Sequence, residues 1–147
     1  MFSARQLFVA LGLSVLLAAA VAGCGSSVGP RTAANSAVLP VSEKDFKISA
    51  PKSVRAGNIQ LVVRHSGPDD HEFILVRAPR DGELPLRADG LTVDEDAIEK
   101  TTAVASEPAP PGTVSNLHVH LTPGRYLMLC NMSGHYRGGM HRTLVVQ

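Results

Sequence analysis

The stretch that decides the fold is residues 124–147, GRYLMLCNMSGHYRGGMHRTLVVQ. Residues 126–130 and 142–146 are rich in the apolar, β-branched and aromatic residues of strands, and a Thr-Pro-Gly turn at 122–124 precedes the first of them. The loop between these two segments has the spacing Cys-x4-His-x4-Met and runs from Cys130 to Met140. One loop between two expected strands therefore gathers a thiol, an imidazole and a thioether.

Further strands are predicted by alternation with period two. The alternating segments are Phe46 to Ser49, Ile59 to Arg64, His71 to Val76 and Leu117 to Leu121. Gly, Pro, Asn and Asp separate the first three of them, as turns require. The sequence therefore predicts an all-β fold, an antiparallel β-sandwich.

A different pattern occupies the long connection 80–115. Thr92 and Glu95 match a capping box ahead of residues 94–99, which predicts one short helix. Three prolines in 107–112 predict an extended loop, because proline cannot donate to a strand ladder.

The N-terminus has the pattern of an export signal. Residues 1–23 carry Arg5 ahead of an apolar run that ends in small residues, followed directly by Cys24. We expect 1–23 to be a lipoprotein signal peptide, Cys24 to be the lipidation site and 24–39 to be a flexible tether. The alternatives are an ordinary signal peptide or an uncleaved membrane anchor. The folded domain is expected to span 40–147.

Charge points to no polyanionic partner. The chain has 14 basic and 13 acidic side chains, and removing 1–23 takes away Arg5 alone among these, which leaves 13 of each. A neutral chain without a basic run does not favour nucleic-acid binding.

The types of side chain in the loop indicate the chemistry. Two histidines and a cysteine in a plane with a weak axial methionine are the ligands of a blue-copper site. His71 begins a predicted strand and shares the face of Phe73 and Leu75, so it is the expected second histidine beside His135. Zinc would not need Met140, and a dinuclear copper site would need a second cysteine in the loop. Each residue alone would be unremarkable, since a buried cysteine is usually a small hydrophobe.

From about Val41 to Gln147 the chain resembles the cupredoxins, with the signatures HSGPDDHEFILV and PGRYLMLCNMSGHYRGGMHRTLVV. The loop spacing is similar to that of rusticyanin, auracyanin and sulfocyanin. The resemblance implies a Greek-key sandwich holding one copper ion, with His71, Cys130 and His135 as equatorial ligands and Met140 as the axial one. It departs at two places: no Asn lies beside the first ligand, where His65 and Glu72 stand, and Ser133 occupies a position that is often Pro.

A closed ligand set without a nucleophile and base predicts a one-electron carrier rather than an enzyme. We expect a monomer that exchanges electrons with redox proteins, with the exposed edge of His135 as the exit. It would be tethered by lipid to the outer face of the cell membrane or in the periplasm. The alternative function is copper storage or delivery, hinted at only by His118 and His120, which are expected on an exposed strand face and could bind a second metal. A copper-free interaction module is a third possibility.

Overall fold

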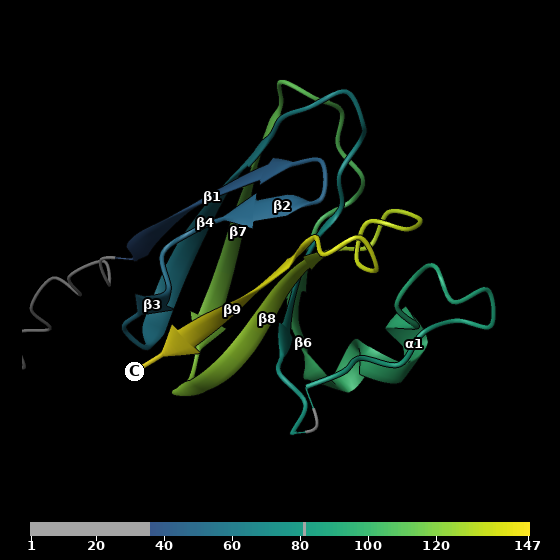
Figure 1. The fold of residues 1–147 in the computed structure, drawn as a ribbon. Coiled ribbons are helices and arrows are strands. Elements are labelled where there is room, and N and C mark those ends of the chain that lie inside the picture. The colour runs from purple at the N-terminus through teal and green to yellow at the C-terminus, as the bar shows by residue number, and fades with distance from the viewer. Residues whose placement is uncertain (1–35, 81) are drawn as a thin grey trace, which may run out of the picture. The chain divides into compact units, whose positions relative to one another are not determined.

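The computed structural model describes residues 36–80 and 82–147. The expected signal peptide, Cys24 and the tether as far as residue 35 lie outside the described residues. Within these residues the chain forms two packed sheets and one short helix (Figure 1). The elements are β1 (Ala37–Lys44), β2 (Lys47–Ser49), β3 (Ser53–Val54), β4 (Gly57–His65), β5 (Phe73–Arg77), α1 (Glu95–Ile98) with a 3-10 turn (Glu99–Thr101), β6 (Thr102–Ala105), β7 (Val114–Leu121), β8 (Gly124–Cys130) and β9 (His141–Val146).

The strand order is β2-β1-β4-β7 in one sheet and β3-β9-β8-β5-β6 in the other. The all-β sandwich predicted from the sequence is confirmed, but it is not wholly antiparallel. Strands β1 and β4 are parallel, and so are β3 and β9. The reason is topological: between β1 and β4 the chain crosses to the other sheet as β3, so it returns beside β1 in the same direction. Such crossings between sheets belong to a Greek-key sandwich.

Strand β5 is buried on both faces, which explains why both of its alternating sets are apolar. Phe73 and Leu75 face the core between the sheets. Ile74 and Val76 face outward, where the segment that contains α1 covers them with Val93 and Ile98. The long connection is therefore a third layer that makes β5 an interior element.

The first strand begins before the expected domain boundary at Pro40. Strand β1 starts at Ala37, and Leu39 and Val41 are buried in the core. The strand was not predicted because it contains Pro40, and proline in sheets is confined to edges and bulges. Here β2 pairs only with Ser42 to Lys44, so β1 has an open side at Pro40.

Three further predictions need correction. Phe46 lies in the turn between β1 and β2, with φ of 59°, rather than in a strand. The helix begins after Asp94, which makes no side-chain capping bond, so the capping box from Thr92 does not form. Strand β6 was not expected, because Thr102 to Ala105 is too short to show alternation. The short helix and the extended loop at 107–112 are confirmed.

No helix among the described residues is long and apolar enough to cross a membrane.

Candidate metal centre

Three of the predicted ligands come together at one end of the sandwich. Cys130 is the last residue of β8, and His71 precedes β5, where it forms a bridge to Ala109. Since β5 and β8 are paired with Phe73 opposite Cys130, the register brings His71 to the thiol. His135 comes from the loop between β8 and β9, on the right of the view in Figure 1.

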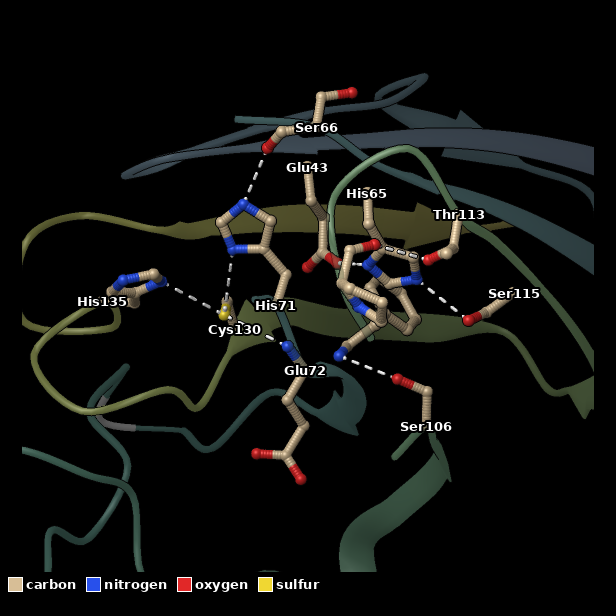
Figure 2. Close-up of polar contacts among 12 residues, drawn as sticks. Glu43, His65, Ser66, His71, Glu72, Ser106, Thr113, Ser115, Cys130 and His135 are labelled. Atoms are coloured by element: carbon tan, nitrogen blue, oxygen red, sulfur yellow. Dashed lines mark hydrogen bonds and ion pairs between the residues drawn. The ribbon is translucent and has the colours of Figure 1, made fainter. Parts of the chain in front are cut away.

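The donor atoms of these three residues converge. One atom each of His71, Cys130 and His135 lies within 4.8 Å of the other two. The Sγ of Cys130 is 3.8 Å from Nδ1 of His71 and 3.5 Å from Nδ1 of His135, and Figure 2 shows both rings turned toward the sulfur. All three residues are buried. A small, enclosed NNS donor set is therefore present.

The loop is held closed by its own backbone. The amide of Met140 donates to the carbonyl of His135 at 2.9 Å, and the amide of Cys130 donates to the carbonyl of Met140 at 3.1 Å. The Met140 side chain is fully buried in the same core cluster as Cys130. These bonds hold the backbone of Met140 beside that of Cys130 and that of His135.

The ring nitrogen of His71 that faces away from Cys130 is hydrogen-bonded, which fixes the orientation of the ring. Its Nε2 lies 2.9 Å from the carbonyl oxygen of Ser66. A carbonyl can only accept, so Nε2 carries the proton and Nδ1 offers its lone pair toward Cys130. Metal-binding histidines are commonly held in this way, through the ring nitrogen that faces away from the metal. A carboxylate oxygen of Asp45 lies 3.4 Å from the same Nε2.

The exposed edge of His135 that was expected as the exit for electrons is not found, because the residue is covered. It is only 7% exposed, because the ring of Phe46 lies against it with 5.1 Å between ring centroids. A carboxylate oxygen of Asp69 is 3.6 Å from its Nε2. Phe46 therefore forms the outer surface of the site, a role that the sequence prediction of a strand residue missed.

The thiol of Cys130 is neutral in the metal-free protein. Burial raises its pKa to about 11, although the amide of Glu72 lowers it by donating to the sulfur from 3.4 Å. Metals bind the thiolate, so binding here displaces a proton. The N–H···S bond remains available to the thiolate and helps to hold the sulfur in place.

An asparagine follows Cys130, and its side chain links the ligand loop to the long connection, while only its backbone N–H reaches the segment of His71. The amide of Asn131 donates to the carbonyl of Glu72 at 3.3 Å. Its side chain accepts from the amide of Val93 at 2.7 Å and donates to Glu95 at 2.7 Å.

Behind His71 lies a buried acid and imidazole that the sequence did not reveal (Figure 2). Glu43 and His65 are neighbours in the register of β1 and β4, with 3.0 Å between Oε2 and Nδ1. His65 Nε2 is 2.9 Å from the hydroxyl of Ser115. Both Glu43 and His65 are buried. His65, which stands at one of the two positions where the resemblance implies Asn, therefore belongs to an ionisable pair.

The remaining histidines lie outside this centre. His118 and His120 are exposed on β7, as predicted from their alternation. His141 is also exposed and its ring packs on Tyr136 at 5.1 Å, so it points away from the centre as expected.

The donor set suits one copper ion. A thiolate and imidazoles favour copper among the available metals, and a buried methionine beside them matches the weak axial ligand of a blue-copper site. Residues 36–80 and 82–147 contain no second cysteine for a dinuclear centre.

No protein-family model matches the sequence, and no curated protein matches it significantly. Solved structures do match. The dithionite-reduced auracyanin of Roseiflexus castenholzii gives a TM-score of 0.58 at 20% identity, covering 76% of this chain and 98% of that one. An azurin of Methylomonas sp. strain J gives 0.57 at 18% identity, covering 76% and 98%. Rusticyanin from Thiobacillus ferrooxidans gives 0.55 at 15% identity, covering 75% and 77%.

These three proteins are cupredoxins, so the chain has the cupredoxin fold. The resemblance noted in the sequence is thereby confirmed at the level of the fold.

Proposed function

We propose that this chain is a mononuclear copper protein that transfers single electrons between redox proteins. His71, Cys130 and His135 hold the ion as equatorial ligands and Met140 is the axial one. When bound, copper supplies a one-electron couple between Cu(I) and Cu(II).

The observation that carries the proposal is the convergence of three donors in a buried site, where His71 is already bonded to the carbonyl of Ser66 and the sulfur of Cys130 to the amide of Glu72. The two rings and the thiol need no rearrangement of the backbone to meet one ion. A site that is the same in both oxidation states suits electron transfer, because little has to move when the charge changes. It does not suit a substrate, since the ligand set leaves no open position.

Copper delivery is the competing function, and the fate of the metal decides between them. The copper-loaded full-length protein is reduced and reoxidised repeatedly by a redox protein in the presence of a moderate chelator, and retained copper is measured. In a parallel experiment the reduced protein is mixed with a copper-free oxidase subunit. We expect repeated cycling with the copper retained. Rapid, complete transfer of copper to the subunit would contradict the electron-carrier function.

The proposal includes a lipid anchor on Cys24, which holds a monomer at the outer face of the membrane or in the periplasm. The support is the sequence alone, where the apolar run ends in small residues before this cysteine. Cys24→Ala is expected to abolish incorporation of labelled fatty acid and to leave the precursor uncleaved after Gly23. Cys24→Ser gives a matched control for size and polarity and is expected to fail in the same way. Label on either variant would contradict this assignment.

A further inference from the structure

Two histidines lie side by side on an exposed strand far from the metal centre. His118 and His120 alternate with inward-facing residues on β7, which is the last strand of its sheet and pairs with β4 alone within that sheet. Residues two apart on a strand point to the same face, about 7 Å apart along the chain. Two imidazoles at this spacing can reach a common ion.

One of the two rings is already oriented. Nδ1 of His120 lies 2.8 Å from the side-chain oxygen of Asn58, its partner in the register of β4 and β7. An amide oxygen can only accept, so Nδ1 carries the proton and the lone pair is on Nε2. This is the arrangement by which a neighbouring acceptor prepares a histidine for a metal.

The surroundings select the kind of ion. A shallow hollow of about 270 Å³ lies over the pair, lined by Ser36, Asn58, Ile59, His118, Val119 and His120. The lining includes no carboxylate, so it does not suit Mg²⁺ or Ca²⁺, which prefer charged oxygen ligands. Two neutral imidazoles with water suit Cu(II), which favours tetragonal N and O donors and binds most strongly among the first-row divalent ions.

We propose that His118 and His120 form a second, surface site for one Cu(II) ion, with Asn58 as a positioning residue. The site is independent of the buried centre. Asn58 is near one end of β4 and His65, which lies near the buried centre, is at the other end. The two residues are about 23 Å apart along the strand. The proposal therefore stands whether or not the buried centre holds copper.

The test is a titration of the full-length protein, without a polyhistidine tag, with Cu(II). Electron paramagnetic resonance follows the titration, and the second ion means the one whose signal depends on His118 and His120, whatever its order of binding and whether or not the buried centre takes up copper. We expect the second ion to show nitrogen hyperfine splitting, and its affinity is measured by competition with glycine. His118→Ala and His120→Ala each should weaken it at least tenfold, to the level of the double variant, because a chelate needs both rings.

Asn58 is tested by a pair of variants. Asn58→Ala should lower the affinity for the second ion by roughly tenfold. This is the lower end of the loss seen when the hydrogen-bond partner of a metal-binding histidine is removed. Asn58→Asp should retain the affinity, because a carboxylate oxygen accepts the same hydrogen bond. The matched control is Asn116→Ala, an exposed residue on the same face of β7, which should leave the affinity unchanged.

The outcomes are distinct. Loss of nitrogen splitting in both histidine variants and its retention in Asn116→Ala would support the site. The proposal is overturned if no second ion survives competition with glycine, if either histidine variant binds as the wild type does, or if Asn116→Ala weakens binding as much as they do. Circular dichroism of each variant checks that the sandwich is intact.

Discussion

Met140 is the residue proposed as the axial ligand. Its backbone is bonded to both loop ligands, and its side chain is fully buried in the core that includes Cys130. The axial ligand sets the potential of a blue-copper site while the equatorial ligands hold the ion.

Met140→Gln is expected to retain coloured copper and to lower the reduction potential, because an amide oxygen favours Cu(II) over Cu(I). The measurement is cyclic voltammetry together with the visible spectrum. The conservative control is Met140→Leu, which removes the donor without offering an oxygen and should not lower the potential. If the glutamine variant has the spectrum and the potential of the wild type, Met140 is not a ligand.

Glu43 gives the fold a dependence on pH. Burial and, to a smaller extent, the charge of Glu72 raise its pKa from 4.5 to about 8. The native state therefore holds this proton more tightly than the unfolded state does, so the stabilisation is present below 4.5 and is lost as the pH rises through about 8. Burial and the charge of His71 lower the pKa of His65 from 6.5. This shift makes the free energy of unfolding rise with pH, but only up to about 6.5.

The window between about pH 7 and 8 reports mainly on Glu43, because burial raises the pKa of Glu72 only to about 7 and the effect of His65 lies below 6.5. In the metal-free protein, Glu43→Gln is expected to lose less stability across this window than the wild type, by up to about 1.4 kcal/mol, since one proton corresponds to about 1.4 kcal/mol per pH unit. The free energy of unfolding is measured by denaturant titration at both ends of the window. Glu99→Gln, at an exposed acid, should behave as the wild type. Equal pH dependence in wild type and Glu43→Gln would show that Glu43 is not the group that titrates.

At the scale of the element, the turn between β1 and β2 covers the site. Phe46 has φ of 59°, a conformation that L residues with large side chains rarely adopt, and its side chain packs on both His135 and Gly138. A Cβ at Gly138 would clash with the Phe46 ring, so the turn and the ligand loop fit closely together. Strain held in place by such contacts is typical of functional positions.

Phe46→Ala is expected to speed the loss of copper to a chelator by up to about tenfold, the factor that corresponds to an aromatic pair of about 1.4 kcal/mol. Phe46→Tyr keeps the ring and should lose copper at the rate of the wild type. The rates are followed by the decay of the visible absorption after chelator is added. If both variants lose copper at the wild-type rate, the turn does not shield His135.

The elements that the sequence revealed are those with a simple pattern. Strand β4 buries one alternating face and exposes the other, so its pattern was plain. Strand β1 contains Pro40 and β6 has only four residues, so neither shows a clear alternation. Phe46 lies two residues before Ile48 and fits the alternation of a strand, although it lies in a turn. Local pattern therefore failed where tertiary packing decides the conformation.

The residues proposed as ligands can be recognised in the sequence, whereas the contacts that orient them cannot. Cys130, His135 and Met140 lie on one loop, so their spacing is visible in the sequence, and the strand pattern pointed His71 inward. The supports are bonds between segments far apart in the chain, such as His71 to the carbonyl of Ser66. A backbone carbonyl has no signature in the sequence, so this contact had to come from the structure.

Two parts of the molecule hold the segments that carry the proposed ligands. The ends of β5 and β8 at one end of the sandwich carry His71 and Cys130. The long connection, which covers these strands, is hydrogen-bonded to Asn131 next to Cys130. The ligands are thus held by the sheet on one side and by the long connection on the other.

In the function proposed above, the buried thiolate of Cys130 binds copper together with the two histidines. The visible absorption spectrum of the Cu(II)-loaded full-length protein tests it most directly, with Cys130→Ser as the comparison. We predict an intense sulfur-to-copper charge-transfer band in the wild type, and its loss in Cys130→Ser, whose circular dichroism remains that of a folded sandwich. A wild-type protein that is fully loaded with copper and colourless would contradict the account.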